Sequence, residues 1–409
     1  MESKVKRTLH TSQWVIAKVK QCFKFRNGKG FSGVLKSFPD EEFCHPVYGG
    51  NGIIGYSDKY LLEEPTIIVG RVGEYCGNVF KTQNKSWVTD NAMMVCDILL
   101  EDYDIDFWVV MLNSLSFNHY SDSTGQPKIT QGGIGAISFK YPSEKEEQTA
   151  IANILSKVDE AIASIQNSIA AAERLKKSLM QNLLTGKMKP DGTFRTPEEF
   201  YIDDKFGKVP IGWEVKKLKD IAQIQRGKFG HRPRNDERFY NGDFPFVQTG
   251  DVVESVFFLK GASQSLNALG ASVSRSFPVN TIIMTIAANI GFVALTRYEV
   301  FFPDSLIGIN AKEDVINPSY LLLHLMRYKN ILDAQATESA QKNINYSNLR
   351  PLPILFPTKK EEQLQITNKV IAIFSEIDSK KTKIKILEQL KKSLMQNLLT
   401  GKIVIANQN

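Results

Sequence analysis

A turn in the second half of the chain gathers cations at a spacing that suits a polyanion. It reads Arg226-Gly-Lys-Phe-Gly-His-Arg-Pro-Arg234 and holds four cations and two glycines in nine residues. Backbone amides and cations on such a turn can approach phosphate groups together. Lys24-Phe-Arg-Asn-Gly-Lys29 in the first half is a weaker counterpart. Both turns predict contacts with a nucleic-acid backbone, although a solvated surface loop is the simpler explanation for any single residue.

Amide side chains stand beside cations at two further places. Gln126-Pro-Lys-Ile-Thr-Gln131 and Gln341-Lys-Asn-Ile-Asn-Tyr346 occupy equivalent positions in the two halves of the chain. Amide and guanidinium groups are the ones that form paired hydrogen bonds with base edges. The glycine-rich turns at residues 48–55 and 70–73 add more polar side chains. The net charge of +7 permits nucleic-acid binding without proving it.

Patterns for catalysis are weak. The chain lacks the Gly-x-x-x-x-Gly-Lys-Ser/Thr motif of nucleotide hydrolases, and Thr185-Gly-Lys187 is better explained as a helix end. Asn317-Pro-Ser-Tyr320 has a superficial likeness to an amino-methyltransferase loop, but a helix that starts at an N-cap Asn followed by Pro accounts for it. Cys44-His45 is a lone pair of possible metal ligands. We therefore predict neither an active site nor a metal site.

Cysteine use and hydropathy indicate a cytoplasmic protein. Four cysteines in 409 residues form no disulfide framework and no zinc spacing, so we expect buried, reduced thiols at Cys22, Cys44, Cys76 and Cys96. No apolar run approaches the ~18 residues of a membrane helix. The N-terminus also lacks the apolar run of a secretory signal.

An internal duplication organises the chain. Thirteen residues from Leu175 to Lys187 recur without change as Leu390 to Lys402, at an offset of 215. Near the start of each half the offset becomes 199, which pairs Trp14 with Trp213. Each half is therefore a divergent head followed by a closely kept tail.

Both tails are predicted to be long helices. Ser143-x-x-Glu and Thr358-x-x-Glu fit capping boxes, and Gly186 and Gly401 supply the expected C-terminal glycines. The ~42 residues between these signals would span roughly 60 Å. Apolar residues recur in heptads that stay in phase at the 215 offset, although alignment by eye suggests 219. The predicted seam is Ile151, Leu155, Val158, Ile162, Ile165, Ile169, Ile366, Val370, Ile373, Ile377, Ile384 and Leu387.

An apolar seam must be buried, and two arrangements achieve this. The two helices can pack against each other as an antiparallel pair within one chain, or each can lie on its own head. We favour the pair. Leu183, Leu184, Leu398 and Leu399 near the helix ends would then contact neighbouring heads or a partner.

The heads are predicted to be α/β. Residues 65–70 and 280–286 have the apolar character of buried strands, and residues 106–115 and 317–326 that of helices. The resulting domains are a first head at 1–142, a helix at 143–187, an ordered linker at 188–212, a second head at 213–357, a second helix at 358–402 and a tail at 403–409. The linker is too rich in aromatic residues for free coil.

This layout resembles the specificity (S) subunit of type I restriction–modification systems. The resemblance is carried by the duplicated Leu-Lys-Lys-Ser-Leu-Met-Gln-Asn-Leu-Leu-Thr-Gly-Lys tails, by Trp14 and Trp213 at the head starts, and by Tyr48-Gly-Gly-Asn-Gly-Ile-Ile-Gly55. It covers essentially the whole chain. The first head departs mildly, since it lacks the Pro-x-x-Trp context that Pro210 and Trp213 keep.

The resemblance implies a non-catalytic, DNA-binding protein. Its two mixed α/β heads would be target recognition domains, each reading one half of a bipartite, asymmetric double-stranded DNA site. The long antiparallel coiled-coil helices would separate the heads and set the spacer between the half-sites. Two methyltransferase (M) subunits would dock and hold S-adenosylmethionine, and restriction (R) subunits would use ATP and Mg²⁺.

The residues that we expect to contact DNA lie on the turns and amide segments described above. They are Arg26, Lys29, Tyr48, Asn51, Arg71, Gln126, Lys128, Arg226, Lys228, Arg232, Arg234, Gln341, Lys342, Asn345 and Tyr346. Two alternatives stay open. One is a coiled-coil scaffold without DNA specificity, and the other is a DNA-modifying enzyme that acts alone.

Overall fold

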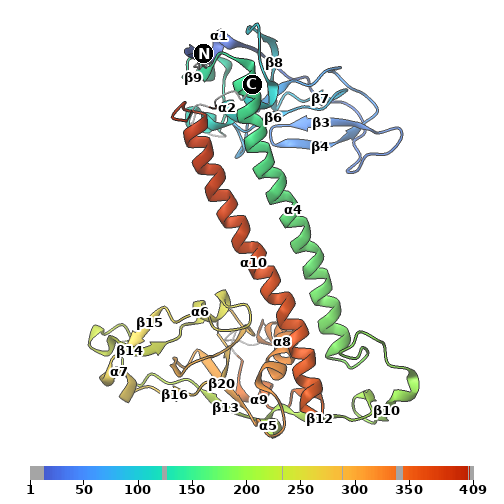
Figure 1. Ribbon diagram of the computed structural model, residues 1–409, viewed down its shortest axis with the longest axis vertical. Coiled ribbons are helices and arrows are strands. Elements are labelled where there is room, and N and C mark those ends of the chain that lie inside the picture. The colour runs from blue at the N-terminus through green and yellow to red at the C-terminus, as the bar shows by residue number, and fades with distance from the viewer. Residues whose placement is uncertain are drawn as a thin grey trace, which may run out of the picture. The chain divides into compact units, whose positions relative to one another are not determined.

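The computed structural model describes residues 13–121, 127–232, 234–287, 289–337, 344–403 and 405 (Figure 1). The chain divides into two compact units. Unit 1 comprises residues 1–165 and 384–409, and unit 2 comprises residues 166–383. Each unit therefore contains one head and a portion of both long helices.

The head of unit 1 is built on two small sheets and a two-stranded ladder. The four-stranded antiparallel sheet has the order β2 (Phe23–Asn27), β8 (Ala92–Ile98), β5 (Ile67–Gly70) and β6 (Val79–Lys81). The second sheet has the order β4 (Gly52–Ser57), β3 (His45–Gly49) and β7 (Trp87–Val88). The ladder pairs β1 (Trp14–Lys18) with β9 (Ser138–Pro142). The helices of this head are α1 (Val19–Cys22), α2 (Ile105–Ser114), α3 (Gln131–Gly135) and the 3₁₀ turn η1 (Phe117–Tyr120).

The head of unit 2 repeats this plan, with a fourth strand in its second sheet. One sheet has the order β13 (Ala222–Arg226), β20 (Leu306–Ala311), β17 (Ile282–Thr285) and β18 (Val293–Leu295). Another has the order β15 (Gln264–Leu266), β14 (Tyr240–Phe246), β19 (Val300–Phe301) and β16 (Ser276–Phe277). The ladder pairs β12 (Trp213–Lys217) with β21 (Pro353–Pro357). The helices are α5 (Leu218–Ile221), α6 (Thr249–Glu254), α7 (Ala268–Ser272), α8 (Pro318–Thr337), α9 (Tyr346–Leu349) and the turn η3 (Glu237–Phe239).

In each head one helix covers the apolar face of a four-stranded sheet, β2–β8–β5–β6 in unit 1 and β13–β20–β17–β18 in unit 2. In unit 1 the Trp108 side chain of α2 is fully buried, with its ring centroid 5.0 Å from that of Phe23 on β2. In unit 2 the Tyr320 and Leu321 side chains of α8 are fully buried in the core that contains β17 and β20. Each such side chain contributes about 1.5–3 kcal/mol of hydrophobic stabilisation. The α/β prediction and the expected strands and helices are confirmed.

The long helices have equal length. They are α4 (Lys145–Leu183) and α10 (Lys360–Leu398), each of 39 residues, or roughly 58 Å. The helix α10 begins and ends 215 residues after α4, which is the offset of the repeated thirteen-residue segment. The heptad phase was therefore the correct guide to the duplication, and the 219 offset is wrong.

Within each unit the two helices run antiparallel and contact each other. Lys391 Nζ lies 2.7 Å from Asp159 Oδ1 in unit 1. In unit 2, Lys380 Nζ donates to Ser168 Oγ at 2.6 Å, and Lys176 Nζ lies 5.0 Å from the Phe374 ring centroid. These three lysines, which we call the seam lysines, occupy heptad positions that are otherwise apolar, and each contacts a polar or aromatic group of the other helix. The alternative of two independent helices is wrong.

The seam residues are covered along both helices. Ile151, Leu155, Ile366, Val370 and Ile377 are buried. The other predicted seam positions, Val158, Ile162, Ile165, Ile169, Ile373, Ile384 and Leu387, are half-buried. At the helix ends, Leu183 and Leu184 join the core of unit 2, and Leu398 and Leu399 that of unit 1.

The predicted capping boxes are wrong. The Ser143 hydroxyl donates to the Gln13 carbonyl at 2.9 Å, and the Thr358 hydroxyl donates to the Gly212 carbonyl at 2.9 Å. Both hydroxyls therefore extend the β1–β9 and β12–β21 ladders instead of capping the helices. Each helix begins two residues later, at Lys145 and Lys360.

A duplicated glutamine anchors each helix start. The Gln363 amide accepts from the Asn317 N–H at 2.7 Å and donates to the Pro357 carbonyl at 2.8 Å. Gln148 repeats this with the Asp104 N–H at 2.9 Å and the Pro142 carbonyl at 3.0 Å. Both side chains are fully buried. Each amide therefore fixes a long helix to the first turn of the helix that covers its sheet, and burial without these bonds would be costly.

Glycines end both long helices as predicted. Gly186 and Gly401 have φ of +66° and +69°, the left-handed conformation of a C-terminal cap. A Cβ at Gly186 would lie 2.3 Å from Pro210 Cγ, and one at Gly401 would lie 3.0 Å from the Trp14 ring. Both positions therefore favour glycine for two reasons: the backbone is left-handed, and a Cβ atom would lie too close to Pro210 or Trp14.

Three smaller expectations meet mixed outcomes. Cys22 and Cys76 are buried, but Cys44 and Cys96 are exposed, so the prediction of four buried thiols is wrong for two. The linker is ordered, with the turn η2 (Pro197–Glu199) and the hairpin β10 (Phe200–Asp203) and β11 (Gly207–Pro210). None of the helices in the described part of the chain is long and apolar enough to cross a membrane.

Candidate nucleic-acid interface

Four segments that are separate in the sequence meet at one edge of the first head. The Lys29 N–H donates to the Val88 carbonyl at 2.9 Å, beyond the end of β2. The Arg71 N–H donates to the Asn91 carbonyl at 2.9 Å, and the Arg71 carbonyl accepts from the Ile129 N–H at 2.8 Å. We call this the loop edge of head 1, defined by residues 28–29, 71–72, 88–91 and 127–130. The cationic turn and the 127–131 segment, separate in the sequence, are thus neighbours.

The second head repeats these hydrogen bonds. The Lys228 N–H donates to the Phe302 carbonyl at 3.0 Å, the Ile286 N–H to the Ser305 carbonyl at 3.2 Å, and the Ile344 N–H to the Ile286 carbonyl at 3.0 Å. The loop edge of head 2 is therefore defined by residues 227–228, 286–287, 302–305 and 344–346. Ile286 and Ile344 are the equivalents of Arg71 and Ile129 in the duplication. The backbone frame is thus the same in both heads, whereas the side chains differ.

Cations on the loop edge of head 1 are accessible. Arg26, Lys29 and Lys128 are exposed and Arg71 is half-buried. The ion pairs among the described residues of this head involve other lysines. These four cations, three on the loop edge and Arg26 near the end of β2, have no acidic partner among the described residues and would attract a polyanion.

Tyr48 and Asn51 have different environments although they share one hairpin. Tyr48 is 4% exposed, its hydroxyl accepts from the Gln83 N–H at 3.1 Å, and burial raises the pKa of its phenol. Its prediction as a DNA contact is therefore wrong, because the ring belongs to the core. Asn51 is exposed at the turn between β3 and β4 and bonds the Asn78 amide at 3.3 Å.

An aspartate holds the arginine-rich turn of head 2. Arg234 Nη2 donates to Asp304 Oδ1 at 2.5 Å, and Arg232 Nη2 lies 3.7 Å from Asp304 Oδ2. Arg226 Nε donates to the carbonyl of the same aspartate at 2.5 Å. Lys228 is exposed and forms no ion pair with the described residues. The turn is therefore more ordered and less positive than its sequence suggests.

A second carboxylate orders the same turn. Asp236 accepts from His231 Nε2 at 3.0 Å and from Arg238 Nη2 at 2.6 Å. The hydrogen bond from Arg238 holds the pKa of Asp236 well below its usual range. Asp236 is therefore ionised throughout the physiological range and keeps His231 and Arg238 in place.

Sequence reasoning missed a cavity beside this turn. Its volume is about 380 Å³, and Phe229, Tyr240 and Phe246 form part of its wall together with Gln248 and Gln264. The Gln248 amide donates to Gln264 Oε1 at 2.9 Å. Paired amide groups are suited to the hydrogen-bonding edge of a nucleobase. The two glutamines stand outside any basic motif, so no local signal marked them.

The structure describes only part of the two amide segments, 126–131 and 341–346. Asn345 is exposed and Tyr346 is half-buried at the start of α9, where the Asn345 N–H donates to Asn348 Oδ1 at 3.3 Å. Gln126, Gln341 and Lys342 lie outside the described residues. Asn345 therefore joins the loop edge of head 2, and the other amides stay predictions.

The Asn317-Pro-Ser-Tyr320 motif, which has a superficial likeness to an amino-methyltransferase loop, has a structural role. Asn317 caps α8, accepting from the Ser319 N–H at 2.9 Å and the Tyr320 N–H at 3.2 Å, as its helix-start interpretation predicts. No group of three or more His, Cys, Asp or Glu side chains that could hold a metal ion gathers among the residues described.

Comparison with known proteins places the chain in a family. Residues 11–174 and 210–391 match the type I restriction modification DNA specificity domain. The MjaVIII specificity subunit of Methanocaldococcus jannaschii is 26% identical over 372 residues, which cover 87% of this chain and 81% of that protein. The EcoprrI specificity subunit of Escherichia coli is 32% identical over 143 residues, 35% of this chain and about a third of that subunit's length.

Solved structures share the fold. The S subunit of a type I restriction–modification system from M. genitalium has a TM-score of 0.66 at 15% identity and covers 97% of this chain and 98% of its own. A chain from a study of complex assembly in the type I system has a TM-score of 0.55 at 13% identity. Because the specificity domain matches both halves, the chain belongs to the type I restriction–modification specificity family and recognises specific DNA sequences within a type I complex.

Proposed function

We propose that each loop edge reads one half of a bipartite, asymmetric DNA site. The observation that supports this is the shared backbone frame with different side chains. Arg71 in head 1 has Ile286 as its equivalent, and Thr130 has Asn345. Two similar platforms with unlike side chains present different groups to base edges, so two half-sites of different sequence would be read.

We propose that α4 and α10 set the unread spacer between the half-sites. Two 39-residue helices joined by a seam are stiff, and their length is fixed by residue count. The seam lysines favour one register, because each has a polar or aromatic partner on the other helix.

We propose that the chemistry resides in partner subunits. Two M subunits would bring S-adenosylmethionine for adenine methylation, and R subunits would bring ATP and Mg²⁺ for translocation and cleavage. Leu175 and Leu390, equivalent residues of α4 and α10, are 48% and 46% exposed. A duplicated exposed leucine offers one apolar contact to each of two identical subunits.

The loop edge can be tested by charge removal. The variant Lys29→Gln/Arg71→Gln should weaken DNA binding by the chain with its M partner, and the slope of log affinity against log salt should fall by about two. Lys36→Gln/Lys81→Gln, which removes two cations of the same head that are paired with Asp40 and Asp106, is the matched control. Equal losses in both variants would refute the assignment of the edge.

The docking of two M subunits has its own test. Leu175→Lys and Leu390→Lys should each reduce the bound M from two copies to one, as measured by native mass spectrometry. Leu269→Lys, at a leucine of the second head that is 52% exposed, is the control. Full occupancy in both helix variants would place the docking surface elsewhere.

A further inference from the structure

Two glutamines of head 2 are joined where β14 ends and β15 begins. Gln248 Nε2 donates to Gln264 Oε1 at 2.9 Å. Gln264 is exposed and Gln248 is half-buried, and both line the cavity of about 380 Å³ beside the arginine-rich turn. The same cavity contacts Pro303 and Ser305, which belong to the loop edge of head 2. The two amides therefore lie next to that loop edge.

The bond between the two amides leaves the outer one able to bind a base. The Gln264 oxygen has a second lone pair, and its NH₂ group donates to no other described residue. An acceptor and a donor thus stand side by side on one planar amide. This pattern matches N6 and N7 of adenine in the major groove. Gln248 restricts the rotation of the Gln264 amide, so less conformational entropy is lost when a base binds.

A single carboxylate holds the backbone at both glutamines. Asp251 Oδ2 accepts from the Gln248 N–H at 2.7 Å and from the Ser263 N–H at 3.0 Å. The Ser263 hydroxyl donates to the same oxygen at 3.0 Å. Because Ser263 directly precedes Gln264, Asp251 fixes both segments that carry the amides. A contact that selects one base needs a side chain whose support is fixed in this way.

The glutamine pair has no counterpart in head 1. The strands β14 and β3 are equivalent, because each pairs in parallel with a strand that leads into the loop edge, β19 in head 2 and β7 in head 1. Gln264 lies opposite Phe246 of β14. Gly55 takes the corresponding place opposite Val47 of β3. Two residues beyond Val47, Gly49 is the equivalent of the other glutamine, so head 1 has glycine at both positions.

We propose that Gln264 recognises adenine in one A·T pair of the half-site read by head 2, and that Gln248 is the positioning residue for this contact. The inference rests on the proposed function, in which each loop edge reads one half-site. Phosphate contacts orient a protein on DNA, whereas contacts with base edges select the sequence. An uncharged amide pair therefore contributes to the choice of base, and its absence from head 1 makes that choice specific to one half-site.

Methylated sites of the complex with its M partner, mapped on a random DNA library, test the contact. Gln264→Ala should reduce the preference for adenine at one position of one half-site by roughly tenfold or more. All other positions, including the whole second half-site, should be unchanged. Gln264→Glu should change the preferred base at the same position to cytosine, because a carboxylate accepts from cytosine N4 and donates nothing.

The role of Gln248 is tested by the same mapping. Gln248→Ala should lower the same preference severalfold with adenine still favoured, because the Gln264 amide is retained but rotates more freely. In the Gln264→Ala background, Gln248→Ala should have no further effect. The matched control is Gln223→Ala, at an exposed glutamine on β13 of the same head, which should change no position.

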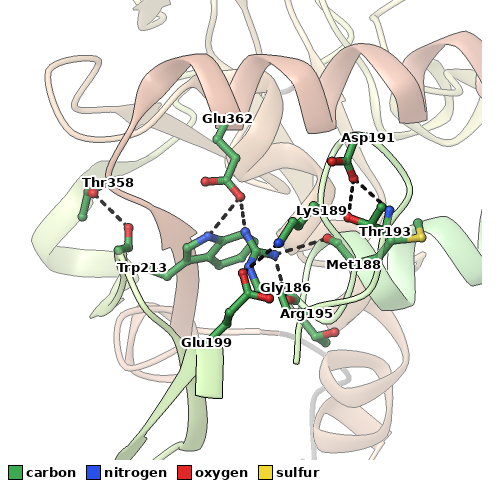
Figure 2. A network of polar contacts seen from close by, with 12 residues as sticks. Gly186, Met188, Lys189, Asp191, Thr193, Arg195, Glu199, Trp213, Thr358 and Glu362 are labelled. Carbon is green, nitrogen blue, oxygen red and sulfur yellow. Dashed lines mark hydrogen bonds and ion pairs between the residues drawn. The ribbon is translucent and has the colours of Figure 1, made fainter. Parts of the chain in front are cut away.

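A second control separates loss of stability from loss of base recognition. In unit 2, Arg195 Nη2 donates to Glu362 Oε1 at 2.5 Å and Arg195 Nη1 donates to the Gly186 carbonyl at 2.8 Å (Figure 2). The Arg195 side chain is only 8% exposed, and neither glutamine belongs to this network. Arg195→Gln should lower the melting temperature of unit 2 by roughly 5–10 °C without changing any preferred base.

Three results would overturn the proposal. Unchanged preferences in Gln264→Ala, with two half-sites still recognised, would remove Gln264 as a reader and leave the loop edges in place. Weakened preference at every position of the half-site, in Gln264→Ala and Arg195→Gln alike, would show that the glutamine only supports the head. A wild-type map without two half-sites would contradict the proposed function itself, and the adenine contact with it.

Discussion

At the scale of single residues, Asp304 controls how the second head presents its charge. It accepts from Arg234 and lies near Arg232, and its carbonyl holds Arg226. A partner DNA must compete with this carboxylate for the same guanidinium groups. Competition of this kind lowers non-specific attraction to phosphates and orients the guanidinium groups before DNA arrives.

Asp304→Asn should therefore raise affinity for random DNA and reduce discrimination between target and random DNA. Both changes are expected because Arg232 and Arg234 lose their charged partner and their side chains can adopt more conformations. Affinity for both DNAs, measured at several salt concentrations, checks this expectation. Asp243→Asn, a neutralisation in the same head on β14, is the control. An unchanged specificity ratio in Asp304→Asn would contradict it.

His324 predicts a pH dependence of stability. Burial, with a smaller effect of Arg327, lowers the pKa of this α8 imidazole from 6.5 to about 3 in the folded state. Below pH 6.5 the imidazole of His324 binds a proton in the unfolded chain but stays neutral in the folded chain. The free energy of unfolding is therefore highest above pH 6.5 and falls as the pH drops toward 3. Between pH 7 and pH 5 unit 2 should lose about 2 kcal/mol.

His324→Phe should remove this part of the slope in chemical unfolding experiments at pH 7 and pH 5. The substitution keeps a ring in the core, and the Tyr320 hydroxyl still donates to the Leu355 carbonyl, 3.2 Å away. An identical loss of stability in both proteins would show that His324 does not titrate on unfolding as we expect.

At the scale of elements, the long helices were the most predictable part of the fold. A heptad repeat that runs the whole length of a segment specifies a helix and its covered face, because the period alone decides which residues align. The helix starts were mispredicted because the pattern Ser-x-x-Glu does not reveal that the Ser143 hydroxyl bonds Gln13, 130 residues away. The contacts of Asp304 were missed for the same reason, since Arg234 is 70 residues distant.

The helix ends make a prediction about glycine. Gly186→Ala should destabilise unit 2 by about 1–3 kcal/mol, because φ is +66° and Pro210 occupies the space of a Cβ. Gly261→Ala, where nothing lies within 4 Å, should be nearly neutral. Thermal unfolding of the two variants compares them directly. Equal effects would mean that the cap is not under the constraint we describe.

At the scale of the whole molecule, the duplicated chain presents a similar backbone platform in each of its two heads. The sequence revealed the duplication, the helix pair and the cationic turns, because these depend on patterns within short windows. It could not reveal that Lys29, Arg71 and Lys128 share one edge, because strand order brings them together. Nor could it show Tyr48 in the core or the cavity beside Gln248, since both depend on packing.

The most direct test is to lengthen both long helices by one heptad at equivalent positions, after Ile162 and after Ile377. The seam stays in phase, and each helix grows by about 10 Å, or roughly three base pairs. The methylated sites of the complex with its M partner, mapped on a random DNA library, should keep both half-sites and gain a spacer longer by about three base pairs. An unchanged spacer with both half-sites still recognised would contradict the claim that the helix pair sets the distance between the two sequences read.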